Sequence, residues 1–268
     1  IKKASGKYLI FMDPDDWYPE GDILEVLFEK AEKSGCQICG GEFSEYDDRT
    51  GEVRTEFPEQ YFGYVFPNEG VIEYKDWQFD FGYYRFLYNR EFVLGHQLYF
   101  PKLIRFQDPP FFVRAMITAE RFYAVKKVVY RYRYGHRELK WTKEKRIDLL
   151  KGIYMDMEMA VQNHLERLVD LTWFRMMEEF GNIIFEGIIE KEKNTREWIE
   201  KIYNILDKNR RERNGYPFYD RLIDEYRKKI ETINALEAGA DAVKKTITFR
   251  VGEILLYIPR SIKLVFFR

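Results

Sequence analysis

The sequence predicts an α/β fold over residues 1–140 that is followed, over residues 141–268, by an α-helical C-terminal region. Residues 8–12 form an apolar run without alternation, which is typical of a strand buried on both faces of a parallel sheet. A helical pattern and a second apolar strand follow at the spacing of a βαβ unit. After Trp141 the pattern changes to long amphipathic stretches, which predict helices.

The first unit has the order strand, loop, helix, strand. Pro19 favours the start of its helix, and the pair Ser34-Gly35 favours the end of it. The second strand is predicted over residues 37–43. We expect the crossover between the two strands to be right-handed.

The remaining elements are predicted from shorter and more widely spaced patterns. Residues 44–76 are polar and rich in turns, which predicts loops and short strands. The segment Asp108-Pro109-Pro110 predicts a helix start, and residues 123–132 a strand. The helices of the C-terminal region are predicted over residues 143–168, 170–193, 195–210 and 216–245.

Composition limits the classes of function. The 268 residues are 46% hydrophobic and carry 44 basic against 45 acidic side chains, a net charge of −1. This balance argues against a general nucleic-acid binder, and we expect no nucleic-acid partner. No apolar run approaches the roughly 18 residues of a membrane-spanning helix, and residues 1–20 lack a signal-peptide layout. We therefore expect a cytoplasmic protein.

An acidic cluster, Asp13, Asp15 and Asp16, follows the first predicted strand directly. Ligands of open α/β sheets bind at the carboxyl ends of strands, which makes these aspartates site candidates. Two carboxylates about 5 Å apart repel by about 3 kcal/mol at an effective dielectric constant of 20, and a bound Mg²⁺ or Mn²⁺ removes that cost. The alternative is an acidic turn that caps the next helix. Spacing alone leaves both interpretations open.

Residues 4–18, ASGKYLIFMDPDDWY, resemble the A-x-G-K-Y, apolar strand, D-x-D-D-W signature of family 2 glycosyltransferases. This resemblance implies an inverting enzyme with a GT-A-like fold, a partial Rossmann-like mixed sheet with flanking helices. It implies Mn²⁺ or Mg²⁺ as cofactor and a nucleotide-sugar donor, a UDP-sugar above all. Asp13 and Asp15 would contact the donor, and Asp15 and Asp16 would hold the metal. Pro14 departs from the pattern, which has a small residue there.

Residues 106–115, FQDPPFFVRA, resemble a second family segment, F-E-D-x-x-F-x-x-R-A. Its aspartate is the proposed catalytic base, which nominates Asp108 to take the proton from the acceptor hydroxyl. Gln107 stands where the family usually has Glu. The alternative role for Asp108 is structural, because Asp followed by Pro is a favourable start for a helix.

Residues 130–136, YRYRYGH, resemble the strand and loop that end the family's catalytic domain. By this resemblance Arg131 and Arg133 would contact the donor diphosphate, and His136 would complete the metal shell. An exposed basic strand edge and a solvated histidine remain the alternative interpretation.

The resemblance covers residues 1–140 and lacks the family's N-terminal base-binding part. We therefore expect the chain to be a fragment or processed form of a longer protein that binds nucleotide sugars poorly by itself.

The resemblance implies sugar transfer to a glycan or lipid-linked acceptor, as in polysaccharide biosynthesis. Residues 249–268 mix bulky apolar with spaced basic side chains, which predicts either peripheral contact with the inner membrane face or a docked final helix pair. Two other functions stay open: a metal-dependent nucleotidyltransferase and a non-catalytic interaction domain with a GT-A-like fold.

Overall fold

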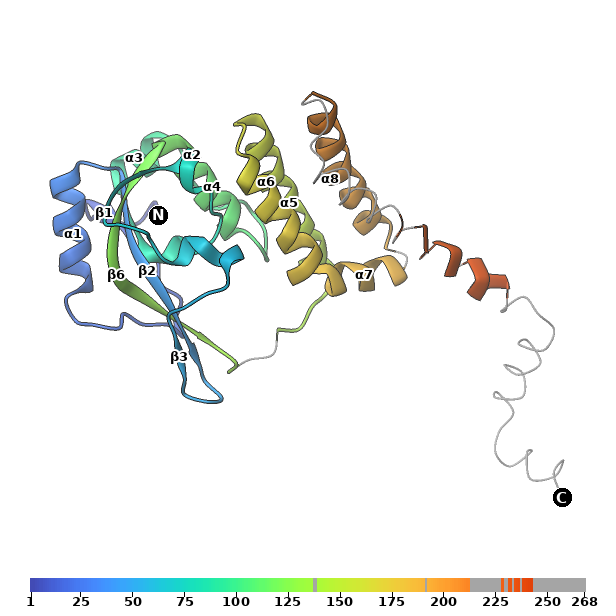
Figure 1. Ribbon diagram of the computed structural model, residues 1–268, viewed down its shortest axis with the longest axis horizontal. Helices are drawn as coiled ribbons and strands as arrows, with labels where there is room; N and C mark the ends of the chain where they lie inside the picture. The colour runs from blue at the N-terminus through green and yellow to red at the C-terminus, as the bar shows by residue number, and fades with distance from the viewer. Residues whose placement is uncertain are drawn as a thin grey trace, which may run out of the picture. The chain divides into compact units, whose positions relative to one another are not determined.

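The computed structural model describes residues 1–136, 139–190 and 192–212, together with 228, 231–232, 234–236 and 238–242. The chain divides into two compact units, Ile1–Ile205 and Leu206–Arg268 (Figure 1). The sheet and most of the described helices belong to the first unit. The segment 249–268 lies outside the described residues, and so does most of the predicted helix 216–245.

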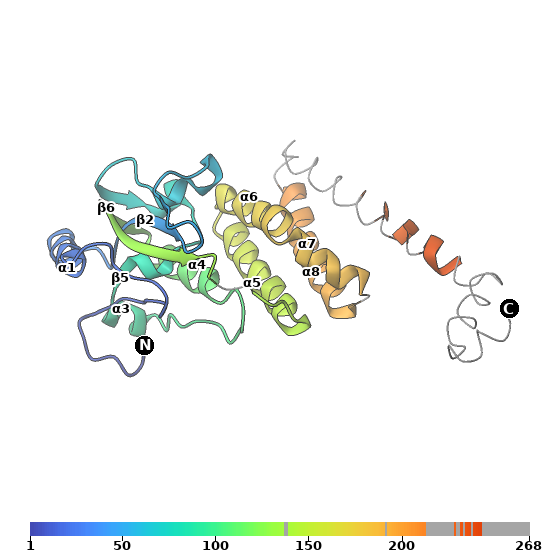
Figure 2. The ribbon, with the colours of Figure 1, turned by 90° about the horizontal axis from the view of Figure 1, so that it is seen from below.

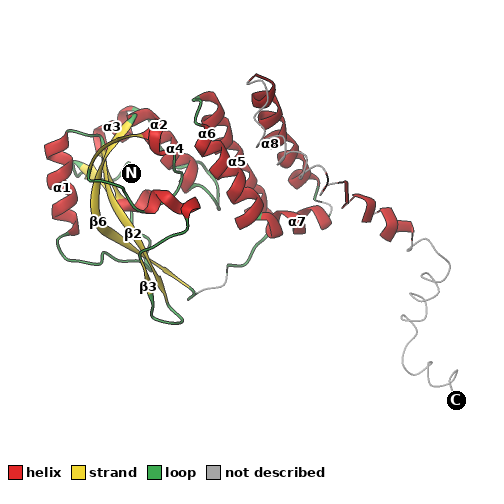
Figure 3. Ribbon diagram, in the orientation of Figure 1, coloured by secondary structure: helices red, strands yellow, loops and turns green. Residues whose placement is uncertain are grey.

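A mixed sheet of six strands forms the centre of the first unit, with the strands drawn in yellow in Figure 3. Its order is β1 (Tyr8–Leu9), β5 (Phe86–Asn89), β2 (Ile38–Asp47), β6 (Arg121–Tyr134) and β4 (Gly70–Glu73), and β3 (Val53–Arg54) pairs with β2. Strands β2 and β6 are parallel, whereas the other pairs are antiparallel. The mixed sheet with flanking helices confirms the predicted fold class.

The first predicted unit is present, but its first strand differs from the prediction. Helix α1 (Ile23–Ser34) ends at Gly35, whose φ of 66° is left-handed, as the Ser34-Gly35 stop predicts. It begins four residues after Pro19. Strand β1 covers only two residues at the edge of the sheet, and β5 lies between it and β2.

Burial of the run 8–12 on both faces of a parallel sheet was therefore the wrong expectation. Of these five residues only Leu9 is buried. The apolar character has another cause, because the Phe11 ring packs against the rings of Phe100 and Phe111, 5.3 and 5.6 Å away between centroids. The run thus contributes to an aromatic cluster beside the sheet instead of to a long strand.

Helices cover both faces of the sheet. Figures 1 and 2 show α1 on one face and α4 (Asp108–Ala119) on the other, with α5 (Lys143–Gln162) packed beyond α4. Short helices connect the strands: η1 (Glu59–Tyr64), α2 (Tyr74–Trp77), η2 (Tyr83–Arg85) and α3 (Arg90–Gly95).

The C-terminal region is helical, as predicted, with more breaks than expected. Helix α5 is followed by α6 (Glu166–Phe174), the π-helical turn η3 (Arg175–Glu179), α7 (Gly181–Ile189) and α8 (Lys193–Glu212). The predicted helix 143–168 breaks at His164, whose φ of 56° is left-handed. Helices α5 to α7 lie within the same compact unit as the sheet. None of the described helices is long and apolar enough to cross a bilayer.

Candidate active site

The acidic segment is attached to the end of β6 by backbone hydrogen bonds. The Arg131 N–H donates to the Trp17 carbonyl at 2.9 Å, and the Trp17 N–H donates to the Arg131 carbonyl at 3.3 Å. The Asp13 N–H donates to the Tyr130 hydroxyl at 3.1 Å. Two segments more than 110 residues apart in the sequence therefore meet at one site.

Asp16 is buried within this attachment. Its Oδ2 accepts a hydrogen bond from the Tyr130 hydroxyl at 2.7 Å, and its Oδ1 accepts one from the Arg133 N–H at 2.8 Å. Burial raises the pKa of Asp16, and the two hydrogen bonds oppose that rise. Because both carboxylate oxygens of Asp16 accept hydrogen bonds from β6, Asp16 fixes the acidic segment against that strand. Its role as a metal ligand stays a prediction.

Asp15 and His136 lie side by side. The Asp15 Oδ2 atom is 2.8 Å from the His136 Nε2 atom, and both side chains are largely buried. The second ring nitrogen of His136, Nδ1, is buried without a hydrogen-bond partner among the described residues. A carboxylate oxygen is a ligand that suits Mn²⁺ or Mg²⁺, whereas an imidazole nitrogen is more typical of transition metals such as Zn²⁺ and Fe²⁺.

No group of three or more acidic, histidine or cysteine side chains gathers as a metal site in the described part of the chain. Mg²⁺ and Mn²⁺ commonly take only one or two protein carboxylates and complete their shell with water and substrate phosphates. Asp15, with His136 beside it, would therefore be enough protein ligation for such a cation.

The side chains of Arg131 and Arg133 point to polar groups at the end of β2. Arg131 Nε donates to the Ser44 hydroxyl at 3.2 Å, and Arg133 Nε donates to Asp48 at 2.7 Å. Both arginines hold the acidic segment through their backbone. Their predicted contact with the donor diphosphate stays a prediction.

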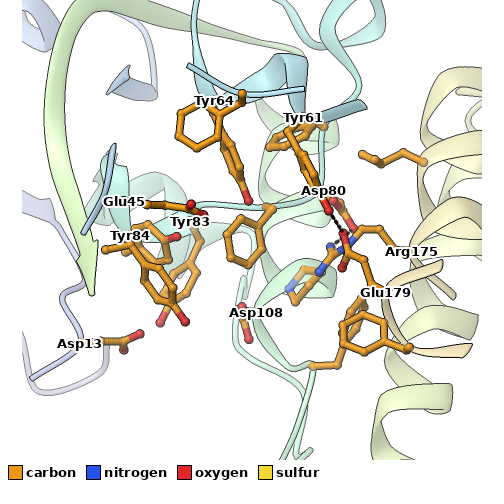
Figure 4. A pocket seen from close by; sticks show the side chains of 18 of the residues that line it. Asp13, Glu45, Tyr61, Tyr64, Asp80, Tyr83, Tyr84, Asp108, Arg175 and Glu179 are labelled. Atoms are coloured by element: carbon orange, nitrogen blue, oxygen red, sulfur yellow. Dashed lines mark hydrogen bonds and ion pairs between the residues drawn. The ribbon is translucent and has the colours of Figure 1, made fainter. Parts of the chain in front are cut away.

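A cavity of about 440 Å³ lies beside the acidic segment (Figure 4). Its polar lining consists of five carboxylates, Asp13, Glu45, Asp80, Asp108 and Glu179, and of three arginines, Arg54, Arg105 and Arg175, with Gln107. Most of the other lining residues are aromatic. The structure therefore brings Asp13 and Asp108 to one cavity, whereas Asp15, Asp16, Arg131, Arg133 and His136 do not line it.

Asp108 is the first residue of α4, and Pro109 and Pro110 follow it in the first turn. The residue before the helix is Gln107, whose side chain makes no capping hydrogen bond. Burial raises the pKa of Asp108, while its own backbone and the positive charges of Arg175 and Arg105 oppose the rise. A partly buried carboxylate with a raised pKa is suited to accept a proton.

Sequence reasoning missed a buried charge cluster on the helical wall of the cavity. Arg175 Nη1 lies 2.5 Å from Asp80 Oδ2, and Arg175 Nε lies 3.0 Å from Glu179 Oε2. The Tyr61 hydroxyl donates to Glu179 at 3.0 Å. In the view of Figure 4, Asp108 lies between Asp13 and this cluster. The i,i+4 spacing of Arg175 and Glu179 could have predicted their ion pair. No sequence pattern near either residue predicts the contact of Arg175 with Asp80.

The loop before Asp108 is held in one conformation. The Ile104 N–H donates to Asp148 on α5 at 2.9 Å. Phe106 has a left-handed φ of 60°, which is unusual for an aromatic residue, and its side chain is buried. Gly152 on α5 leaves the space that Phe106 occupies, because a Cβ there would lie 2.5 Å from the Phe106 carbonyl oxygen. Helix α5 thus positions the loop that carries Asp108.

Gly152→Ala is expected to lower the free energy of unfolding by about 1–3 kcal/mol, because the added methyl overlaps the Phe106 backbone. Urea denaturation measures this effect. Gly95→Ala is the matched control, since a Cβ at Gly95 meets nothing within 4 Å. Equal stability of the two variants would contradict the proposed support of the loop.

Asp156 on α5 is fully buried, and neither of its carboxyl oxygens has a hydrogen-bond partner among the described residues. Burial raises the pKa of Asp156 well above its usual value, and the nearby charge of Asp80 adds to the rise. Burial therefore favours the protonated form of Asp156 in the folded protein, whereas the unfolded chain ionises this side chain above a pH of about 4.

The stability contributed by protonated Asp156 is thus complete below a pH of about 4 and is lost as the pH rises toward the raised folded pKa. Asp156→Asn removes this dependence. We expect the free energy of unfolding of the variant, relative to wild type, to increase between pH 4 and pH 7. Urea denaturation at several pH values measures it, and a difference that does not change with pH would exclude a protonated Asp156.

Comparisons with known proteins bear on this site. Residues 1–95 match Glycosyl transferase family 2. No curated protein sequence matches the chain. The chain is similar to the crystal structure of S. aureus TarS 1-349 in complex with UDP-GlcNAc, at 15% identity and a TM-score of 0.53. It is also similar to the crystal structure of S. aureus TarS, at 15% identity and a TM-score of 0.53.

The similarity to the first structure covers 76% of this chain and 58% of the TarS chain, and that to the second covers 82% and 36%. At this identity the likeness shows a common GT-A-like fold. The family match contains the acidic segment, and the fold places the end of β6 against it. Over residues 1–95, this chain is therefore similar to glycosyl transferase family 2, and its fold is GT-A-like.

Proposed function

We propose that this chain carries the catalytic centre of a metal-dependent, inverting glycosyltransferase. It transfers a sugar from a nucleotide diphosphate sugar to a glycan or lipid-linked acceptor. The observation that carries the proposal is the joint lining of one cavity by Asp13 and Asp108, next to the Asp15–His136 pair. The donor is a UDP-sugar, as the UDP-GlcNAc bound to the similar TarS structure supports.

Asp108 acts as the general base. A carboxylate oxygen of Asp108 takes the proton of the acceptor hydroxyl while the hydroxyl oxygen attacks the anomeric carbon of the donor sugar. The bond from that carbon to the diphosphate breaks on the opposite face of the ring, so the configuration inverts. Burial of Asp108 supports this role, because it makes the carboxylate a better proton acceptor.

Asp15 and His136 would hold Mn²⁺ or Mg²⁺, with Asp16 fixing the loop between them and β6. The cation supplies positive charge that stabilises the departing diphosphate. Asp13 faces the cavity and contacts the nucleotide side of the donor. Arg131 and Arg133, at the end of β6, would contact the donor diphosphate.

The test is UDP release by the full-length protein, with Mn²⁺, UDP-sugars and a panel of glycan acceptors. We expect turnover that falls about a hundredfold or more in Asp15→Ala, because a ligand of the leaving-group cation is lost. Turnover equal to wild type in this variant would contradict the assigned metal site.

The same preparation distinguishes the other functions. Pyrophosphate released from UTP and a sugar phosphate would favour a nucleotidyltransferase. Absence of any turnover with every donor would favour a non-catalytic interaction domain. The proposed place of action, a cytoplasmic membrane face reached through residues 249–268, is tested by co-sedimentation with anionic liposomes, with and without that segment.

A further inference from the structure

The three arginines that line the cavity differ in their partners. Arg54 pairs with Glu45, and Arg175 pairs with Asp80 and Glu179, so the chain itself neutralises both guanidinium groups. Arg105 pairs with no carboxylate in the described part of the chain. Its Nε atom is buried there without a hydrogen-bond partner. A buried donor of this kind costs free energy unless a ligand satisfies it.

The side chain of Arg105 is held in place instead of being free to move into water. Its guanidinium carbon lies 5.4 Å from the centre of the Trp141 ring, a distance typical of cation–π contact. The residues on either side are fixed, Ile104 by its hydrogen bond to Asp148 and Phe106 by its fit over Gly152. Arg105 is therefore a preorganised cation at the wall of the cavity.

The remaining walls suit a saccharide. Six partly exposed aromatic side chains line the cavity: Phe57, Tyr61, Phe81, Tyr83, Tyr132 and Phe180. Flat apolar faces together with a few fixed polar groups are typical of sites for small organic ligands such as sugars. Asp108, the proposed base, lies three residues after Arg105 and lines the same cavity.

The position of Arg105 favours the acceptor over the donor. Asp13, which would contact the nucleotide side of the donor, also lines the cavity, but Arg105 lies three residues before the proposed base Asp108 and on the same loop. A general base has to meet the acceptor hydroxyl, so the groups around Asp108 contact the acceptor.

We propose that Arg105 binds an anionic substituent, a phosphate or a carboxylate, on a saccharide acceptor, and so selects charged over neutral glycans. This inference rests on the proposed function for the assignment of the cavity to the acceptor. An arginine forms paired, charge-assisted hydrogen bonds with either oxyanion, which sets the orientation of the acceptor as well as its affinity.

The test uses glucose 6-phosphate and glucose as probes of the full-length protein, with binding followed by saturation-transfer NMR and titration. We expect glucose 6-phosphate to bind more tightly than glucose. Arg105→Gln should weaken glucose 6-phosphate about tenfold or more and leave glucose unchanged. Arg105→Lys should retain part of the preference, and Arg121→Gln, at an exposed arginine outside the cavity, should retain all of it.

Titration of UDP with Mn²⁺ on the same variants separates the two sources of phosphate. Unchanged UDP affinity in Arg105→Gln supports an acceptor site, whereas a parallel loss of UDP affinity overturns it in favour of a donor contact. Equal binding of glucose 6-phosphate to wild type and Arg105→Gln also overturns the inference. These readouts do not require turnover, so a failure of the proposed function would appear separately, as absent UDP release.

Discussion

Asp108→Asn is expected to lower the rate of sugar transfer by the full-length protein by about 10²- to 10⁴-fold, the usual contribution of a general base. Asn preserves the size of the side chain but cannot take a proton from the acceptor hydroxyl. The affinity for UDP should not change, because the residues assigned to the donor, Asp13, Asp15 and His136, all keep their side chains in this variant. The measurement is kcat from UDP release together with the affinity for UDP.

The pH dependence provides a second readout of the same residue. Because the base must be ionised, kcat/KM of wild type should rise with pH through a pKa that burial shifts above the usual aspartate value. Asp108→Asn should lack this rise. Asp76→Asn, at an exposed position on α2, is the control for the loss of one charge. A variant that keeps transfer within about tenfold of wild type would contradict the assignment of Asp108 as base.

Arg175→Met is expected to lower the free energy of unfolding by about 3–5 kcal/mol, because it leaves the buried carboxylate of Asp80 without its partner. Met replaces much of the volume of the arginine stem, so loss of packing contributes little. The effect should exceed that of breaking an exposed pair, which is worth about 0–1 kcal/mol. Urea denaturation measures this loss of stability, provided that the dependence of the unfolding free energy on urea concentration is the same in variant and wild type.

A double-mutant cycle separates the ion pair from packing. The double variant Arg175→Met, Asp80→Asn removes both charges together and should lose less stability than the sum of the single variants. Arg54→Gln, which breaks the exposed pair with Glu45, is the matched control among the residues that line the same cavity. Additive effects, or a cost of Arg175→Met no larger than that of Arg54→Gln, would contradict a buried ion pair.

The sequence predicted the elements that local patterns determine. Helix α1 with its Gly35 stop, helix α4 beginning at Asp108 and the long strand β6 all appear close to the predicted places. Each follows from residues near one another in the chain, such as a left-handed glycine or prolines in a first turn. The joint lining of one cavity by Asp13 and Asp108 is a finding of the structure.

Contacts between residues far apart in the chain could not be predicted from the sequence. The hydrogen bonds that engage both oxygens of Asp16 come from Tyr130 and Arg133, and no local pattern specifies them. Strand β1 was predicted too long, because an apolar run does not reveal whether its residues pair with a neighbouring strand or pack their side chains into an aromatic cluster. The pair of Asp80 with Arg175 spans 95 positions, so it was visible only once the helices were packed.

Isothermal titration of UDP into the full-length protein, with and without Mn²⁺, examines the proposed centre without requiring the acceptor. We predict binding that depends on Mn²⁺ and is lost in Asp15→Ala, because Asp15 and His136 would hold the cation whose positive charge attracts the diphosphate. Asp76→Asn should bind UDP as wild type does. UDP affinity that is the same without Mn²⁺, or the same in Asp15→Ala, would contradict a metal-dependent glycosyltransferase centre at this site.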